Sequence, residues 1–161
     1  MPRRRTGTCS VAVQVVLDAV IVLRHEGRRT DGEVLMEESF GWMASSDFEH
    51  RSGEPLRLAL QAESCHVHQM AVTALNEAGI AWQEVFVGGG IATIGAAAAA
   101  GLAVAALSPR VAPPGTMDMG ESLGLPPLPT RSVVLQSRPS EPATRRALRT
   151  FTSALRATAG H

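Results

Sequence analysis

The most reactive side chains of this sequence lie together in the run CHVH at residues 65–68. A thiol next to two imidazoles could bind a metal ion or act as a nucleophile beside its general base. However, the run opens an expected helix that ends at Gly79, and on a helix His66 and His68 do not share a face. No distant pair of Cys or His completes a zinc site, so we expect neither a metal nor a cofactor.

The same run follows an expected strand at residues 56–60, and Ser64 stands where the N-cap of the helix would be. A turn from a strand into a helix brings polar groups to the edge of a sheet. We therefore interpret Cys65, His66 and His68 as polar residues at the mouth of a ligand pocket, with Ser64 at the turn before them. An enzyme that uses Cys65 and His66 is the alternative, which fast alkylation of the thiol would indicate.

A second turn from a strand into a helix is expected at three consecutive glycines, Gly88, Gly89 and Gly90. Aromatic and β-branched residues at 81–87 favour a strand, and the alanine-rich run at 91–100 favours a helix that Gly101 ends. Together with Ile91, the turn would offer unpaired N–H groups and the positive end of a helix dipole. These groups suit an anion or a carboxylate.

An apolar strand at residues 102–107 completes a β-α-β unit around this turn. The glycines are not a dinucleotide fingerprint, because Thr93 stands where GxGxxG requires a glycine. A Walker lysine is excluded because the sequence contains no Lys. Residues 85–108 carry no charge, but their Ala and Gly content and Gly101 argue against a membrane span.

Further elements are expected towards both ends of the chain. The expected strands are Ala19–Leu23, one or two strands within residues 33–43, and residues 132–136. Between the strands of the second group, Glu37 and Glu38 are adjacent and would face opposite sides of a strand, so we expect a solvated turn there rather than an acid–base pair.

A final helix is expected from Pro142. Its apolar stripe would consist of Ala147, Leu148, Phe151, Ala154 and Leu155. We expect this stripe to pack on the strand Ala19–Leu23.

Composition excludes several classes of function. The 161 residues carry 15 Arg and 15 acidic residues, so the net charge of zero gives no electrostatic basis for nucleic-acid binding. Aromatic residues make up only 4%, which removes the stacking surfaces of a single-strand binder. The two cysteines form no disulfide framework, which indicates a reducing, cytoplasmic location. The apolar run after the first arginines lacks a cleavage site for export.

Several segments, taken in order, resemble the effector-binding domain of LysR-type transcriptional regulators. They are LDAVIV, GEVLMEESFGWMAS, PLRLAL with the following helix, AAGLAVAALSPRVAPPG and GLPPLPTRSVVLQSRP, within residues 17–156. The resemblance implies an α/β fold like the two-lobed type 2 periplasmic binding proteins, with Rossmann-like lobes and a small effector in the cleft. Residues 1–55 and 109–161 would form the first lobe and residues 56–108 the second, joined by crossings near 44–55 and 108–114.

The sequence also departs from this family. The winged helix-turn-helix of the family cannot be formed by the residues before Leu17, and the first strand and helix of the first lobe are missing. The first lobe is therefore expected to be incomplete and the chain truncated at its N-terminus. Where relatives place Ser or Thr at the pocket turn, this chain has Gly88 and Gly90, which leave only backbone donors.

These features predict a non-enzymatic regulatory domain that senses a small anionic metabolite in the cleft between the lobes. The expected site residues are Ser64, Cys65, His66, Gly88, Gly89, Gly90 and Ile91. The alternative is a remnant that only dimerises. Its partner would be a second copy or a full-length regulator, and DNA would be reached only through the absent helix-turn-helix. We also expect the strand Ala19–Leu23 to be an exposed edge that promotes dimerisation or aggregation.

Overall fold

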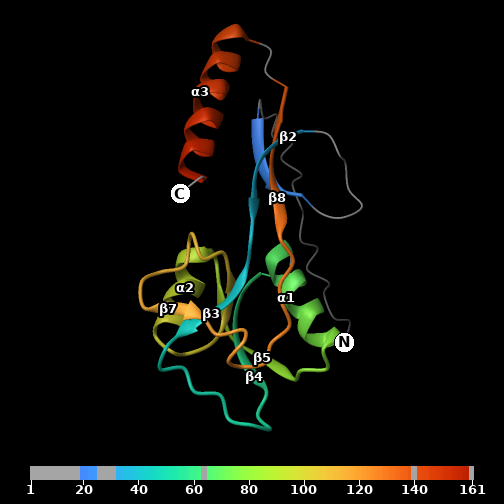
Figure 1. Ribbon diagram of the computed structural model, residues 1–161, viewed down its shortest axis with the longest axis vertical. Helices are drawn as coiled ribbons and strands as arrows, with labels where there is room; N and C mark the ends of the chain where they lie inside the picture. The colour runs from blue at the N-terminus through green and yellow to red at the C-terminus, as the bar shows by residue number, and fades with distance from the viewer. Residues whose placement is uncertain (1–18, 25–31, 63–64, 139–140, 160–161) are drawn as a thin grey trace, which may run out of the picture. The chain divides into compact units, whose positions relative to one another are not determined.

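The computed structural model describes residues 19–24, 32–62, 65–138 and 141–159 (Figure 1). The chain divides into two compact units, Met36–Val133 and a unit made of Met1–Leu35 with Val134–His161. The strands β2 (Glu33–Glu38) and β8 (Arg131–Ser137) each run across the boundary of these units. The lobe boundaries expected from the family resemblance are not tested by these units and stay a prediction.

The smaller unit contains β1 (Ala19–Leu23), the strand predicted from the sequence, in a sheet of order β1-β8-β2. Within the described part of the chain, β1 is therefore an edge strand, and Val20 and Ile21 on it are 36% and 39% exposed. A row of unpaired backbone groups beside exposed apolar side chains favours pairing with another chain.

The predicted C-terminal helix is present as α3 (Pro142–Ala159), but the expected apolar stripe is wrong in part. Thr152 is buried and Leu148 half-buried, whereas Phe151 is 48% exposed. The reason is an anchor at the end of the helix: Arg156 Nη2 lies 2.6 Å from Glu33 Oε1 and 3.0 Å from the carbonyl oxygen of Val34. Residues 148, 152 and 156 share one helix face, so this anchor turns Phe151 to solvent.

The larger unit contains one continuous arrangement of strands. β4 (Leu56–Gln61) pairs in parallel with β5 (Trp82–Gly88), and β3 (Gly41–Ser45) pairs antiparallel with β6 (Ala105–Leu107) and β7 (Thr116–Asp118). A parallel bridge between Leu58 and Val104 joins the two sets, with hydrogen bonds of 2.9 Å. The strand order is therefore β5-β4-β6-β3-β7.

Helices α1 (His66–Glu77) and α2 (Ile91–Ala99) connect the parallel strands of this sheet. Alternate residues of the strands enter two separate cores, one containing Leu58 and Val104 with Leu75 of α1, the other Ala59 with Ile94 of α2. Because neighbouring strand residues face opposite sides, the middle of the sheet is covered on both faces, and β6 is fully buried as its apolar run predicted.

Both helices end at the predicted glycine. Gly79 and Gly101 have φ angles of 67° and 70°, a left-handed conformation that glycine adopts without strain. After α2, the N–H of Leu102 bonds the carbonyl of Ala97 at 3.1 Å, which completes the same C-terminal motif as after α1. The strand expected at 102–107 is therefore too long, because its first residues belong to the helix end and β6 begins at Ala105.

The expectation of a solvated turn at Glu37 and Glu38 is wrong. Both residues belong to β2, and they face opposite sides as the period of a strand requires. Glu37 is exposed and accepts a hydrogen bond from Ser132 Oγ at 2.8 Å. Glu38 is buried and accepts a hydrogen bond from Ser108, and its carboxylate lies 3.6 Å from Arg110 Nε. These partners compensate the burial of a charge.

Candidate functional site

Both predicted turns begin at the same edge of the sheet. In the parallel pair of β4 and β5, the last residue of each strand is opposite the other, Gln61 against Gly88. β6 is parallel to β4, so Ser108, directly after β6, follows at this edge as well. In open α/β sheets ligands bind outside the carboxyl ends of the strands. Ser64, the predicted cap of the first turn, lies outside the described residues.

In the first turn, Cys65 precedes α1 in an extended conformation, with φ −76° and ψ 128°. Its thiol donates to Gln61 Oε1 at 2.7 Å, so the thiol is held against the end of β4. His66, the first residue of the helix, is exposed. Among the residues that the structure describes, no three His, Cys, Asp or Glu side chains gather as a metal ion requires.

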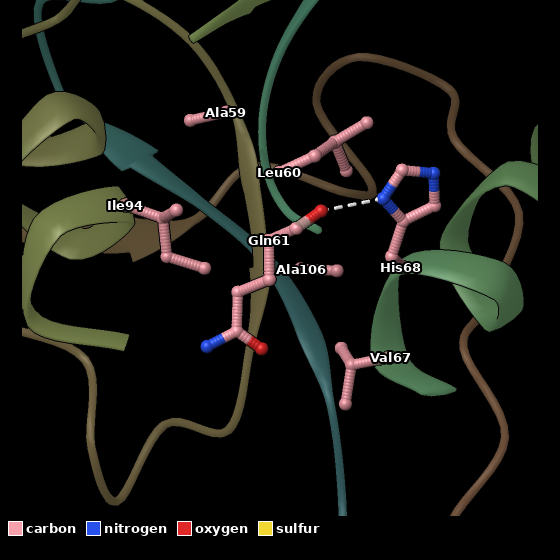
Figure 2. A pocket seen from close by; sticks show the side chains of 7 residues that line it. All are labelled: Ala59, Leu60, Gln61, Val67, His68, Ile94 and Ala106. Atoms are coloured by element: carbon pink, nitrogen blue, oxygen red, sulfur yellow. Dashed lines mark hydrogen bonds between the residues drawn. The ribbon is translucent and has the colours of Figure 1, made fainter. Parts of the chain in front are cut away.

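The histidine that faces inward is His68. Its Nδ1 lies 2.7 Å from the carbonyl oxygen of Gln61, and because a carbonyl can only accept, Nδ1 is the donor (Figure 2). Nε2 of the neutral ring is then an acceptor. His68 and Gln61 line a small cavity together with Ile94 of α2. Its volume is about 10 Å³, roughly the space of one water molecule.

In the second turn, Gly88 is buried and Gly90 is the N-cap of α2. A methyl group at Gly88 would collide with Thr93 and would lie 2.8 Å from Ile94 Cγ2, so this position requires glycine for space. Thr93 Oγ1 donates to the carbonyl of Gly90 at 2.8 Å and accepts its N–H at 3.4 Å. The turn is therefore held by its own helix.

The start of α2 leaves donors for a ligand. Gly90 has no side chain to cap the helix, and Ile91 is 45% exposed. By helix geometry, the N–H groups of Ile91 and Ala92 have no acceptor within the helix. Nothing lies within 4 Å of the position that a methyl group would take at Gly89 or Gly90, so the turn is open.

The sequence reasoning missed two polar residues at this edge, Gln61 and Ser108. Gln61 binds both Cys65 and His68, and Ser108 directly follows β6. His68 was expected at the mouth of the pocket but was not among the expected site residues. Their common signal is a polar residue at or directly after the end of a parallel strand, or one turn into the following helix.

The fold and these turns define an α/β ligand-binding domain of the type 2 periplasmic-binding-protein class. Residues 14–160 match the family described as LysR substrate binding domain, so the chain belongs to this family. It is an effector-binding regulatory domain of the LysR type, and this domain is non-enzymatic.

One curated relative is the HTH-type transcriptional regulator PecT of Dickeya dadantii (strain 3937). It is 31% identical over 98 residues, which are 61% of this chain and 31% of PecT, so the matched segment spans about a third of that relative.

Solved regulatory domains share the fold at low identity. The apo regulatory domain of HypT from Salmonella typhimurium has a TM-score of 0.63 at 12% identity, covering 88% of this chain and 73% of that one. For CcmR from Synechocystis PCC6803 in complex with 2-PG the TM-score is 0.63 at 13% identity, covering 86% and 73%. For reduced OxyR from Pseudomonas aeruginosa it is 0.60 at 21% identity, covering 87% and 72%.

Within the described part of the chain, no helix is both long and apolar enough to cross a membrane. The uncharged stretch that raised this question is divided among β5, α2 and β6.

Proposed function

We propose that this domain senses a small anionic metabolite in the cytoplasm, and that the metabolite binds at the turns after β4 and β5. The single observation that carries the proposal is the pairing of Gln61 with Gly88, which brings the ends of the two strands together. The proposed site consists of the first turn, Ser64, Cys65 and His66, and the second turn, Gly88, Gly89, Gly90 and Ile91. The complex of CcmR with 2-PG supports a small ligand in a domain of this fold.

The preference for an anion rests on the donors of the second turn. The N–H groups at the start of α2 point out of the helix, where the helix dipole is positive. No charged residue occurs between Val85 and Ser108, so no carboxylate of that segment opposes an anion.

Calorimetry and thermal-shift measurements with a panel of organic acids and their neutral amides test this proposal. We expect at least one acid to bind and its amide to bind more weakly. Binding of amides and acids with equal affinity would contradict an anion site, and an empty screen on folded protein would contradict effector binding.

Gly90→Val tests the location of the site. The φ and ψ of Gly90, −174° and 173°, are open to any residue, and its Cβ would meet nothing within 4 Å. The fold should therefore be kept while the methyl groups cover the first donors of α2. We expect affinity for the acid to fall about tenfold, which corresponds to one charge-assisted hydrogen bond of roughly 1.5 kcal/mol. Ala96→Val, at an exposed position of the same helix, is the control and should leave affinity unchanged.

A second candidate function is dimerisation, with a second copy or a full-length regulator as partner. The observation in its favour is the exposed edge of β1 with Val20 and Ile21. In the regulator, DNA would then be contacted by the helix-turn-helix of the partner. Co-expression with a full-length regulator should yield mixed dimers of reduced DNA affinity. Recovery of full-length dimers alone would exclude this role, and Ile21→Lys should reduce any self-association.

A further inference from the structure

A second, larger cavity lies at the other end of the strand order, where β3 and β7 pair. Its volume is about 520 Å³, within the range of about 300–1,000 Å³ that small-molecule sites occupy. Phe40, Leu125 and Leu128 give it an apolar lining. Trp42 forms part of the wall and is fixed there, because it is buried and its indole N–H donates to the carbonyl of Pro126 at 2.7 Å.

Asp118 brings a carboxylate to this lining in a fixed position. Its Oδ1 accepts the N–H of Trp42 at 3.1 Å and the N–H of Gly120 at 2.9 Å. Two glycines, Gly41 and Gly120, lie close to this carboxylate in space, and a methyl group at Gly41 would collide with it. At Gly120 a methyl group would lie 3.1 Å from Asp118 Oδ1. The carboxylate therefore occupies space that is free because Gly41 and Gly120 have no side chains.

The described residues that line the cavity carry negative charge only. Glu121 adds a second carboxylate, and among the described residues it takes part in no ion pair. No Arg or His belongs to the described residues that line the cavity. Two carboxylates beside an aromatic ring and leucines match a positive group that carries an apolar body, because ammonium groups bind both carboxylates and aromatic faces.

We propose that this cavity is a second ligand site, which takes a small organic cation such as an arylalkyl amine. The ammonium group lies between Asp118 and Glu121, and the apolar body lies against Phe40, Leu125 and Leu128. The site is separate from the proposed anion site, which is at β4 and β5, while this cavity is at β3 and β7. Its ligand has the opposite charge, so failure of either proposal leaves the other intact.

Titration with 2-phenylethylamine, followed by the indole N–H signals in a two-dimensional NMR spectrum, tests the proposal. The sequence holds two Trp, and only Trp42 lines the cavity. We expect the Trp42 signal to move in a saturable way while that of Trp82 stays. 2-Phenylethanol, the neutral analogue, and phenylacetate, the anionic one, should bind at least about fivefold more weakly.

Two variants test whether the carboxylates of Glu121 and Asp118 bind the ammonium group. Glu121→Gln and Asp118→Asn should each weaken amine binding about fivefold, the upper end for an exposed ion pair. Asparagine at position 118 still offers Oδ1 to both N–H groups, so the loop should stay folded. Glu84→Gln removes an exposed acid from β5, outside the cavity, and should leave amine binding unchanged.

Three outcomes would overturn the proposal. The first is a Trp42 signal that does not respond to the amine. The second is equal binding of the amine, the alcohol and the acid, which would mean an apolar site without charge selection. The third is a shift of the Trp42 signal with protein concentration in the absence of amine, which would assign the cavity to a second copy of the chain.

Discussion

Ser108 donates a hydrogen bond to the carboxylate of Glu38, 70 residues away in sequence, and both side chains are buried. Arg110 completes the cluster. Its side-chain Nε lies 3.6 Å from Glu38 Oε1, and its backbone N–H donates to Ser108 Oγ at 3.2 Å. The end of β2 is thus joined to the loop after β6 by polar contacts around a buried carboxylate and a buried hydroxyl, while the Arg110 side chain is 42% exposed. This burial is the basis of the first prediction.

Ser108→Ala should lower the free energy of unfolding by about 1–3 kcal/mol, because it leaves a buried carboxylate without its hydroxyl donor. Urea denaturation of the folded chain measures this loss. Ser132→Ala is a matched control, since it removes a serine–glutamate hydrogen bond of 2.8 Å to Glu37 that is exposed. The control should cost less than about 0.5 kcal/mol. Equal losses for both variants would contradict the importance of burial here.

Gly88→Ala and Gly89→Ala should change the free energy of unfolding in opposite directions, although the two glycines are adjacent. The methyl group at Gly88 meets Thr93 and Ile94 in a packed region, which should cost about 1–3 kcal/mol of stability. Gly89 has open space and no positive φ, so alanine should stabilise by up to about 1 kcal/mol through the unfolded chain. Thermal denaturation of both variants measures these changes. A Gly88→Ala variant as stable as the original chain would mean that α2 moves easily to make room for the methyl group.

In α3, Leu148→Ala should cost about 1–2 kcal/mol, whereas Phe151→Ala should change stability by less than about 0.5 kcal/mol. The reason is the orientation of the helix, which half-buries Leu148 and leaves Phe151 48% exposed. Denaturation at low protein concentration measures both. A large loss for Phe151→Ala that grows with protein concentration would instead show that Phe151 is covered by a second copy.

Backbone amides should exchange with deuterium faster in β1 than in β6. β6 lies inside the sheet order of the larger unit, and all its residues are buried, whereas β1 is an edge strand in the described part of the chain. Amides of Ala105–Leu107 should therefore be protected more strongly than those of Ala19–Leu23. Equal protection in a dilute monomer would mean that other residues cover the edge of β1.

The local pattern of the sequence was sufficient for most elements of the larger unit. Alternation of apolar residues, the alanine-rich run and the glycines at the helix ends gave strands and helices close to those observed, since these signals act over a few residues. The predicted strand boundaries were wrong where the C-terminal motif of a helix extends into the expected strand, as at Leu102 after α2. Glu37 and Glu38 were misassigned because charge was taken as a sign of solvent, while Glu38 finds Ser108 and Arg110 across the fold.

By itself, the sequence determined where the chain turns from strand to helix, because glycine, serine and alanine set local backbone preferences. It also determined the family, through segments such as AAGLAVAALSPRVAPPG. Only the tertiary structure decided which polar residues meet. Strand order and register decide the pairing of Gln61 with Gly88, the inward position of His68 rather than His66, and the cavity beside Asp118. The strand pairing and the cavity join residues far apart in the chain, and even the contact of His68 with Gln61 depends on how α1 packs beside β4, so no local propensity encodes them.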